Sequence, residues 1–212
     1  MDKRGRGYVV ALFGPDGSGK STVADLIEET SQANGLTTAR FHWRPRIFPG
    51  LKNSGTVDTT QPDQFATRSW VFSVAMHFYI FFDFVLGWFF RLRSHLIRGN
   101  VVVYERYFYD LLFHPRRYKL ARIPWLSNFL AKIVPKPQFI VLLTGDPNLI
   151  YLRKPELPLE EIVKQQALMK NYLGVLGPII HVDTTTLSPI ETTVSICEQV
   201  GLSTDILQKK LG

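Results

Sequence analysis

The sequence predicts an α/β fold built on a parallel sheet. Short apolar runs alternate along the 212 residues with longer stretches of helical pattern, which is typical of parallel strands joined by crossover helices. The runs are apolar almost throughout, as in strands that are buried on both faces of a sheet. The five expected strands are GYVVALFG (7–14), TTARFHW (37–43), VVVYE (101–105), QFIVLLTG (138–145) and PIIHVDT (178–184).

Helices are expected in the intervals between these strands. The first is predicted over 18–34 and ends at Gly35, and a long apolar helix precedes the third strand. Residues 47–62 have the loosest pattern and are expected to form a surface loop. We find no internal repeat and no low-complexity linker, so one domain is expected over residues 1–212. The remaining helices are predicted near 124–134, 159–174 and from about 189 onward.

The charge of the chain favours an anionic partner. Lysine and arginine exceed aspartate and glutamate by 25 to 18, which gives a net charge of +7. This surplus suits a nucleotide, a nucleic acid or an acidic membrane surface and does not choose among them. Cys197 is the only cysteine, so no intrachain disulfide is possible. The apolar run after the basic N-terminus is too short for a secretory signal, so a cytoplasmic protein is expected.

The segment that follows the first strand, GPDGSGKST, is the strongest functional signal. It matches the phosphate-binding pattern G-x-x-x-x-G-K-[ST] between a strand and a helix. Its glycines let backbone N–H groups converge on phosphate oxygens, and the next helix points its N-terminus at the same anion. The lysine neutralises the β- and γ-phosphates, and the serine hydroxyl is placed to ligate Mg²⁺. The residues expected to bind the nucleotide are Gly14, Asp16, Gly17, Ser18, Gly19, Lys20, Ser21 and Thr22.

The third strand ends in Glu105-Arg106-Tyr107, at the edge of a parallel sheet where ligands bind. A carboxylate at this place can order Mg²⁺ and its waters, so Ser21 and Glu105 are the predicted metal ligands. The adjacent Arg106 can hold a phosphate between donor and acceptor. A surface Glu–Arg pair is the plainer alternative, and the neighbouring phosphate-binding loop argues against it.

These motifs and their order resemble the thymidylate kinase-like group of P-loop kinases. The likeness extends over nearly the whole chain, through VVVYERY, PKPQFIVLLTGDP and VDTTTLSPIE, and Glu105-Arg106-Tyr107 stands where the group has Asp-Arg-Tyr. The resemblance implies a three-layer fold with a five-stranded sheet in the order 2-3-1-4-5. It also implies ATP as the phosphoryl donor, a short lid near 151–162, and a place for Asp16 near the acceptor. With Lys20 and Arg106, the lid residue Arg153 is then expected to be catalytic.

The acceptor half departs from the group. The arginine that follows the helical aspartate is replaced by Phe84, and the group's serine and Tyr-Gln pair give way to Asp110 and His114-Pro115. Asp83 is expected to orient Arg106 or to accept from an acceptor hydroxyl, with a buried ion pair as the plainer reading. The residues predicted to bind the acceptor are His42, Arg44, Asp83, Tyr107 and Asp110.

The apolar segment from Trp70 to Phe90 is long enough to span a bilayer. Asp83 at its middle and its place between two strands of one sheet argue against a span. A helix with a second, outward apolar face is expected instead. In the resembled kinases this helix forms a homodimer, so a homodimer is expected here, with peripheral membrane contact as the alternative.

Three functions remain open. The first is an ATP-dependent phosphotransferase like the thymidylate kinases, acting on a small nucleotide acceptor. The second is a kinase of the same fold that phosphorylates a sugar or glycan hydroxyl, for which Asp16, Asp83 and Glu105 are candidate bases. The third is a P-loop NTPase or nucleotide-binding module without an acceptor. No nucleic-acid partner is expected.

Overall fold

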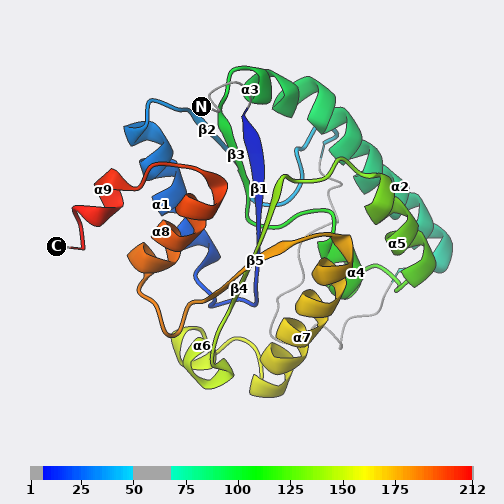
Figure 1. Cartoon of the computed structure of the whole chain (residues 1–212). Helices are drawn as coiled ribbons and strands as arrows, with labels where there is room; N and C mark the ends of the chain where they lie inside the picture. The colour runs from blue at the N-terminus through cyan, green and yellow to red at the C-terminus, as the bar shows by residue number, and fades with distance from the viewer. Residues whose placement is uncertain (1–6, 50–67, 212) are drawn as a thin grey trace.

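The computed structural model describes residues 7–49 and 68–211. Its five strands form one parallel sheet in the order β2-β3-β1-β4-β5, which confirms the predicted fold class and strand order. Figure 1 shows the sheet between two layers of helices. The strands are β1 (Tyr8–Phe13), β2 (Thr38–Phe41), β3 (Val101–Tyr104), β4 (Phe139–Thr144) and β5 (Ile179–Asp183).

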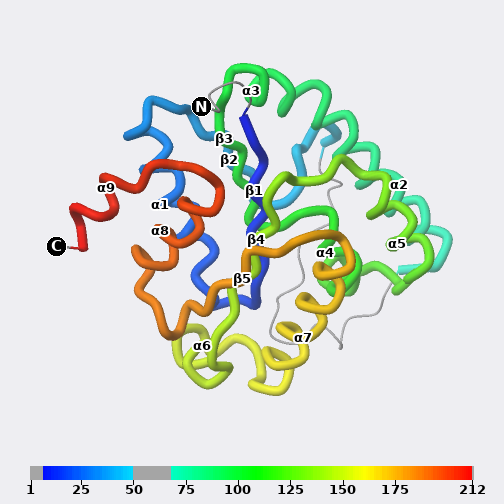
Figure 2. Tube along the Cα trace, in the orientation of Figure 1, coloured from blue at the N-terminus to red at the C-terminus, as the bar shows by residue number. Residues whose placement is uncertain are grey.

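The central strand β1 divides the apolar residues of the molecule into two cores. Val10 and Leu12 face α1 (Lys20–Ala33) and α8 (Pro189–Val200), which cover one side of the sheet (Figure 1). Ala11 and Phe13 face the other side, because successive side chains of a strand point to opposite faces. The tube in Figure 2 shows α9 (Asp205–Gln208) beyond α1 and α8, near the C-terminus. Both faces of the sheet are therefore covered, as the apolar strands predict.

The second face carries the larger and more aromatic core. It contains the rings of Tyr104, Tyr107 and Phe108, and Phe84 packs against all three at centroid distances of 4.9–6.0 Å. Arranged around it are α2 (Trp70–Gly87), α4 (Asp110–Phe113), α5 (Pro124–Ile133) and α7 (Leu159–Leu176) (Figure 1).

The long helix before β3 is interrupted once. The α-helical part α2 passes into a π-helical turn at Trp88–Leu92 and then into α3 (Arg93–Ile97). At the junction, a Cβ on Gly87 would lie 2.3 Å from Cβ of Pro45, so the loop after β2 approaches this helix as closely as only glycine allows. The end of α2 therefore packs directly against the loop that follows β2.

The structure describes two other predicted segments, the loop and the lid, to different extents. The loop predicted at 47–62 lies largely outside the described residues. The predicted lid at 151–162 comprises the end of α6 (Pro147–Arg153), a short connection and the start of α7. Ile150, Leu157 and Ile162 form a small buried cluster beneath this connection. The pattern-based expectations missed the 3₁₀ turn η2 (Pro115–Tyr118), the short helix α4 before it and the C-terminal helix α9.

Candidate active site

The loop between β1 and α1 has the backbone geometry of a phosphate cradle. Gly14 has φ +152°, and a Cβ there would lie 2.4 Å from the carbonyl oxygen of Leu143 on β4. Gly17 has φ +90°, and a Cβ there would lie 3.0 Å from the carbonyl oxygen of Ile150. Both positions therefore require glycine, for the backbone conformation and for the close approach of neighbouring chain.

The N-terminus of α1 has the free N–H groups and the positive charge that favour an anion. Gly19 precedes the helix without a side-chain cap, and the first turn contains no acidic residue. The N–H groups and the partial positive charge of the helix N-terminus are therefore not compensated by the helix itself. The hydroxyl of Ser18 is buried without a hydrogen-bond partner. A polyphosphate would satisfy these donors.

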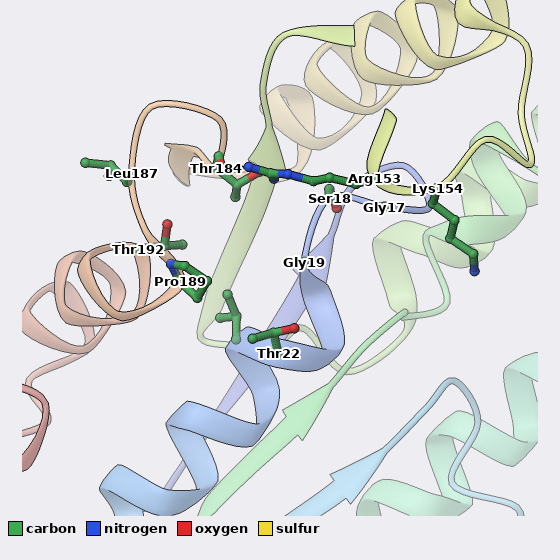
Figure 3. Close-up of a pocket in the computed structure, with 11 residues that line it drawn as sticks. Gly17, Ser18, Gly19, Thr22, Arg153, Lys154, Thr184, Leu187, Pro189 and Thr192 are labelled. Atoms are coloured by element: carbon green, nitrogen blue, oxygen red, sulfur yellow. Dashed lines mark hydrogen bonds between the residues drawn. The ribbon is translucent and has the colours of Figure 1, made fainter. Parts of the chain in front are cut away.

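A cavity of ≈ 400 Å³ opens beside this helix start. The predicted nucleotide-binding residues Gly17, Ser18, Gly19 and Thr22 line it, and Thr184, Leu187, Pro189 and Thr192 close the opposite side (Figure 3). Its size is within the usual range for small-molecule sites. Arg153 reaches across it and donates from Nη2 to the carbonyl oxygen of Thr184 at 2.8 Å, whereas Lys154 points away (Figure 3).

Ser21 and Glu105 meet directly, as the predicted metal site requires. The hydroxyl of Ser21 donates to Oε2 of Glu105 at 2.6 Å, and Arg40 on β2 contacts Oε1 at 2.7–2.9 Å. Burial acts to raise the pKa of Glu105, but the hydrogen bonds from Ser21 and Arg40 outweigh it and hold the pKa below its ordinary value. Hydroxyl and carboxylate oxygens suit Mg²⁺, which keeps its remaining positions for water and phosphate. The described residues contain no cluster of three or more acidic, histidine or cysteine ligands.

Asp16 is the centre of a buried charge cluster. Its Oδ1 lies 2.7 Å from Nη2 of Arg106 and 3.8 Å from Nζ of Lys20, and its Oδ2 lies 3.0 Å from Nη2 of Arg117. Burial acts to raise the pKa of Asp16, but the charges of Arg106, Arg117 and Lys20 outweigh it and hold the pKa far below its usual range. Asp16 is therefore ionised and links two arginines to the lysine of the loop.

Lys20 is buried against the loop between β1 and α1. Its Nζ donates to the carbonyl oxygens of Gly14 at 2.8 Å and Pro15 at 2.7 Å. Burial, and next the charge of Arg106, lower the pKa of Lys20 to about 7 despite the opposing effect of Asp16. A bound polyphosphate would favour the charged form of this lysine.

Asp110 belongs to the same cluster. It accepts a hydrogen bond from the hydroxyl of Tyr118 and is almost fully buried. Burial acts to raise the pKa of Asp110, but the charges of Arg106 and Arg117 lower it below the ordinary value. Burial lowers the pKa of the neighbouring His114 to about 4, so this imidazole is neutral at physiological pH. The negative charge of Asp110 is thus compensated within the cluster.

Asp83 does not orient Arg106. Its carboxylate is fully buried and accepts from the backbone N–H groups of Arg46 at 3.1 Å and Phe48 at 2.8 Å. Arg44 lies beside it, with Nη1 3.7 Å from Oδ2 and its guanidinium 5.7 Å and 5.3 Å from the ring centroids of Trp43 and Tyr79. The structure therefore gives Asp83 and Arg44 a role in holding the loop after β2 on α2.

The other two predicted acceptor residues differ in position. Tyr107 is buried in the aromatic core and donates its hydroxyl to the carbonyl oxygen of Pro135, so it packs beneath the site. The ring of His42 is 65% exposed, with Nδ1 3.7 Å from Oε2 of Glu105. Of these two residues, only His42 lies at the open edge of the site.

Sequence reasoning missed Arg40 and the specific place of Arg117. Arg40 lies on a strand, where its alternation with apolar neighbours gave no functional signal. Arg117 stands in a basic run with Arg116, Lys119 and Arg122 after the third strand, a pattern typical of a solvated face. No sequence motif distinguishes Arg117 from the other cations of this run. It is the conformation of η2 that buries the side chain of Arg117.

Comparisons with known proteins agree with this geometry at the level of the fold. No family model matches the sequence, and no curated protein is significantly similar to it. Thymidylate kinase from Ehrlichia chaffeensis superposes with a TM-score of 0.53 and 14% identity, over 92% of this chain and 98% of that chain. Thymidylate kinase from Candida albicans superposes with a TM-score of 0.54 and 20% identity, over 92% of each chain. The chain therefore has the thymidylate kinase-like P-loop fold.

Proposed function

We propose that the protein is an ATP-dependent phosphotransferase that moves the γ-phosphoryl group of ATP to a small acceptor. The observation that carries this proposal is the charge cluster on Asp16, where Lys20, Arg106 and Arg117 converge on one carboxylate of the phosphate-binding loop. Phosphoryl transfer depends mainly on alignment and on positive charge around the transferred group. A module that only bound nucleotide would not need two buried arginines beyond the lysine of its loop.

Each residue has a role in the proposed reaction. Ser21 and Glu105 would hold Mg²⁺, which neutralises charge on the phosphates when it is bound. Lys20 binds the β- and γ-phosphates, and Arg106 lies between the donor loop and the acceptor. An acceptor oxygen forms a bond to the γ-phosphorus while the bridging P–O bond breaks, and ADP leaves with the electron pair.

The carboxylates of the site favour an acceptor that brings an ionised oxygen. A hydroxyl acceptor must lose its proton, and the best general base has a pKa near the working pH. The pKa values of Asp16, Glu105 and Asp110 are all lowered, and Asp83 is engaged by the backbone of the loop after β2. A phosphomonoester needs no such base, because its oxygens are already largely ionised near pH 7. A sugar or glycan hydroxyl remains the second candidate acceptor.

We expect weak activity on dTMP. The residues of the thymidylate kinase pattern that would meet the base and the acceptor phosphate are replaced by Phe84, Asp110, His114 and Pro115. Phe84 and Asp110 are buried and have packing or charge partners of their own. A site that reads a base by hydrogen bonds loses on the order of 10⁴-fold in discrimination when these partners are missing.

The test measures ATP consumption against nucleoside monophosphates, nucleosides, sugar phosphates, sugars and glycan fragments, with an acceptor-free control. We expect acceptor-dependent turnover with at least one phosphomonoester, and its loss in Lys20→Ala while the fold is retained by circular dichroism. Turnover with a hydroxyl acceptor alone would support the second candidate. ATP hydrolysis that no acceptor accelerates would support an NTPase and contradict the proposal, as would unchanged turnover in folded Lys20→Ala.

We also propose that the protein forms a homodimer, in the cytoplasm, through the outer face of α2. Trp70–Ile97 is the one helix of the described chain that is long and apolar enough to cross a membrane, although His77 and Asp83 on it are buried within the fold. Further exposed apolar side chains lie on α5, which packs against α2. So many exposed apolar residues on two neighbouring helices favour a contact surface. We call this set the apolar face: Trp70, Val71, Phe78, Phe82, Phe89, Phe90, Trp125, Phe129 and Ile133.

The oligomeric state and membrane binding separate the two possible uses of the apolar face. We expect light scattering after size exclusion to give the mass of a dimer, and the double variant Phe82→Glu/Phe90→Glu to be monomeric. A monomeric wild-type protein that floats with anionic vesicles would instead assign the apolar face to a membrane surface.

A further inference from the structure

We propose that Arg117 contacts the γ-phosphoryl group of the bound nucleotide and stabilises it during transfer. This inference rests on the proposed function and adds a catalytic residue to it. The residue lies on η2, a turn outside the phosphate-binding motif and outside the segment predicted as a lid. Three features of the structure lead to it: the geometry of Gly17, the position of Arg153 and the burial of Arg117.

The phosphate-binding loop cannot supply an arginine at its fourth position. Gly17 has φ +90°, where side chains are strained, and its Cβ would lie 3.0 Å from the carbonyl oxygen of Ile150 and 3.1 Å from Cβ of Lys154. The middle of α6, at Ile150, and its end, at Lys154, thus lie against this glycine. A positive side chain for the γ-phosphoryl group must therefore come from another element.

The arginine of the predicted lid is directed elsewhere. Arg153 donates to the carbonyl oxygen of Thr184 at 2.8 Å (Figure 3), in a cavity that Leu187 and Pro189 also line. This position is at the end of β5, on the side of the cavity away from Asp16 and β3. Arg153 is therefore placed to contact the donor nucleoside.

Arg117 and Lys20 lie on either side of the same carboxylate, that of Asp16. Its Nη2 is 3.0 Å from Oδ2 of Asp16, and Oδ1 of the same group is 3.8 Å from Nζ of Lys20. The side chain of Arg117 is only 9% exposed, whereas its neighbour Arg116 is exposed. A guanidinium has five N–H donors in a planar fork, so it can contact a carboxylate and phosphate oxygens together.

The cluster has no carboxylate to spare for the ammonium form of Lys20. The guanidinium groups of Arg106 and Arg117 are matched by the carboxylates of Asp16 and Asp110. Buried charges are costly unless they are paired, so a charged Lys20 beside these two arginines suits an added anion. The γ-phosphate at the end of a nucleotide in the loop would supply that charge.

The turn that carries Arg117 is held firmly. Tyr118 stacks on Trp43 with ring centroids 3.8 Å apart, and its hydroxyl donates to Asp110. The backbone N–H of Arg117 donates to the carbonyl oxygen of His114 at 3.1 Å. Arg117 is thus presented to the loop from a fixed support, which lowers the cost of placing its charge at the reacting group.

The experiment compares binding of AMPPNP and ADP, which differ in the γ-phosphoryl group, by calorimetry with Mg²⁺. We expect Arg117→Ala to weaken AMPPNP binding by about 10-fold or more, the loss of a charge-assisted hydrogen bond, and to change ADP binding less than about 2-fold. Arg117→Gln keeps an N–H donor for Asp16 without the charge and should show the same selective loss, also if Arg117→Ala fails to fold. The matched control is Arg122→Ala, an exposed arginine of the same basic run, which should leave both affinities unchanged.

Other outcomes would overturn the inference. An equal loss of AMPPNP and ADP affinity would show that Arg117 only positions Asp16 and the loop. Unchanged affinity for both nucleotides in a folded Arg117→Gln protein would show that it does not reach the γ-phosphoryl group. If the wild-type protein bound neither nucleotide, the proposed function itself would fail. That result is distinct from failure of the inference, in which the wild-type protein binds both nucleotides and the Arg117 variants show no selective loss of AMPPNP affinity.

Discussion

Nucleotide binding at pH 8 should be accompanied by uptake of a proton at Lys20. Burial, together with the charge of Arg106, lowers the pKa of this lysine to about 7, whereas an unperturbed lysine titrates near 10.5. The free protein therefore holds Lys20 largely neutral at pH 8. Phosphate oxygens beside the amine favour its charged form, so binding should raise the pKa and draw a proton from solution.

The size of the effect follows from these values. With a pKa of about 7, Lys20 is protonated in roughly one molecule in eleven at pH 8. A complex in which phosphate oxygens restore the ordinary lysine pKa of about 10.5 keeps Lys20 protonated at pH 8, so uptake approaches about 0.9 proton for each nucleotide bound. Phosphates ionise with a pKa near 6 and contribute little at this pH. By linkage, nucleotide affinity should fall about tenfold from pH 8 to pH 9.

Calorimetry in buffers of different ionisation enthalpy counts these protons directly. We expect the apparent enthalpy to change with buffer in the wild-type protein, and this dependence to vanish in Lys20→Arg, because a guanidinium stays protonated in both states. The pKa of His42 is also lowered, first by burial, so His42→Asn is the control that should keep the full uptake. An uptake near zero in the wild-type protein would contradict the reasoning.

Three further predictions concern single residues. Asp83→Ala should lower the free energy of unfolding by about 2 kcal/mol or more in urea, because two backbone N–H groups lose their acceptor; a loss below about 0.5 kcal/mol would contradict this role. Gly17→Ala should weaken ATP binding at least about tenfold in a fluorescence titration, since its Cβ would press on Ile150 in a strained conformation, and tight binding would show that the loop adapts. Arg153→Ala should raise KM for ATP more than it lowers kcat in steady-state assays, because Arg153 lies against Thr184. A fall in kcat alone would show that Arg153 acts on the transferring phosphoryl group instead.

Most of the sheet could be predicted from the sequence. The runs that became β1, β3 and β4 are apolar throughout because both faces are covered, so neither their length nor their type was ambiguous. The strand order needed the resemblance to a known group, since periodicity does not tell which strands are neighbours. The short elements α4 and η2 could not be predicted, because turns of four residues lack a repeating pattern.

The sequence made its most specific predictions for the donor half of the site, because the chemistry expected there depends on backbone geometry at fixed spacing. Ser21 and Glu105 could be paired from a motif and a strand end, and the structure brings them together. The acceptor half could not be resolved in this way. Asp83 reads as a functional carboxylate in an apolar helix, but its partners are backbone groups of a loop that no side-chain pattern reveals. Arg117 reads as surface charge, and only the fold turns it toward Asp16.

The most direct test of the central proposal follows the labelled γ-phosphorus of ATP to its product. ATP labelled at this position is incubated with the wild-type protein, Mg²⁺ and each class of acceptor, and the products are separated from inorganic phosphate. We expect label in a phosphorylated acceptor, foremost one that already carries a phosphomonoester, and none in that product with Lys20→Ala. Label that appears only in inorganic phosphate, at the same rate with and without acceptors, would contradict phosphoryl transfer to an acceptor.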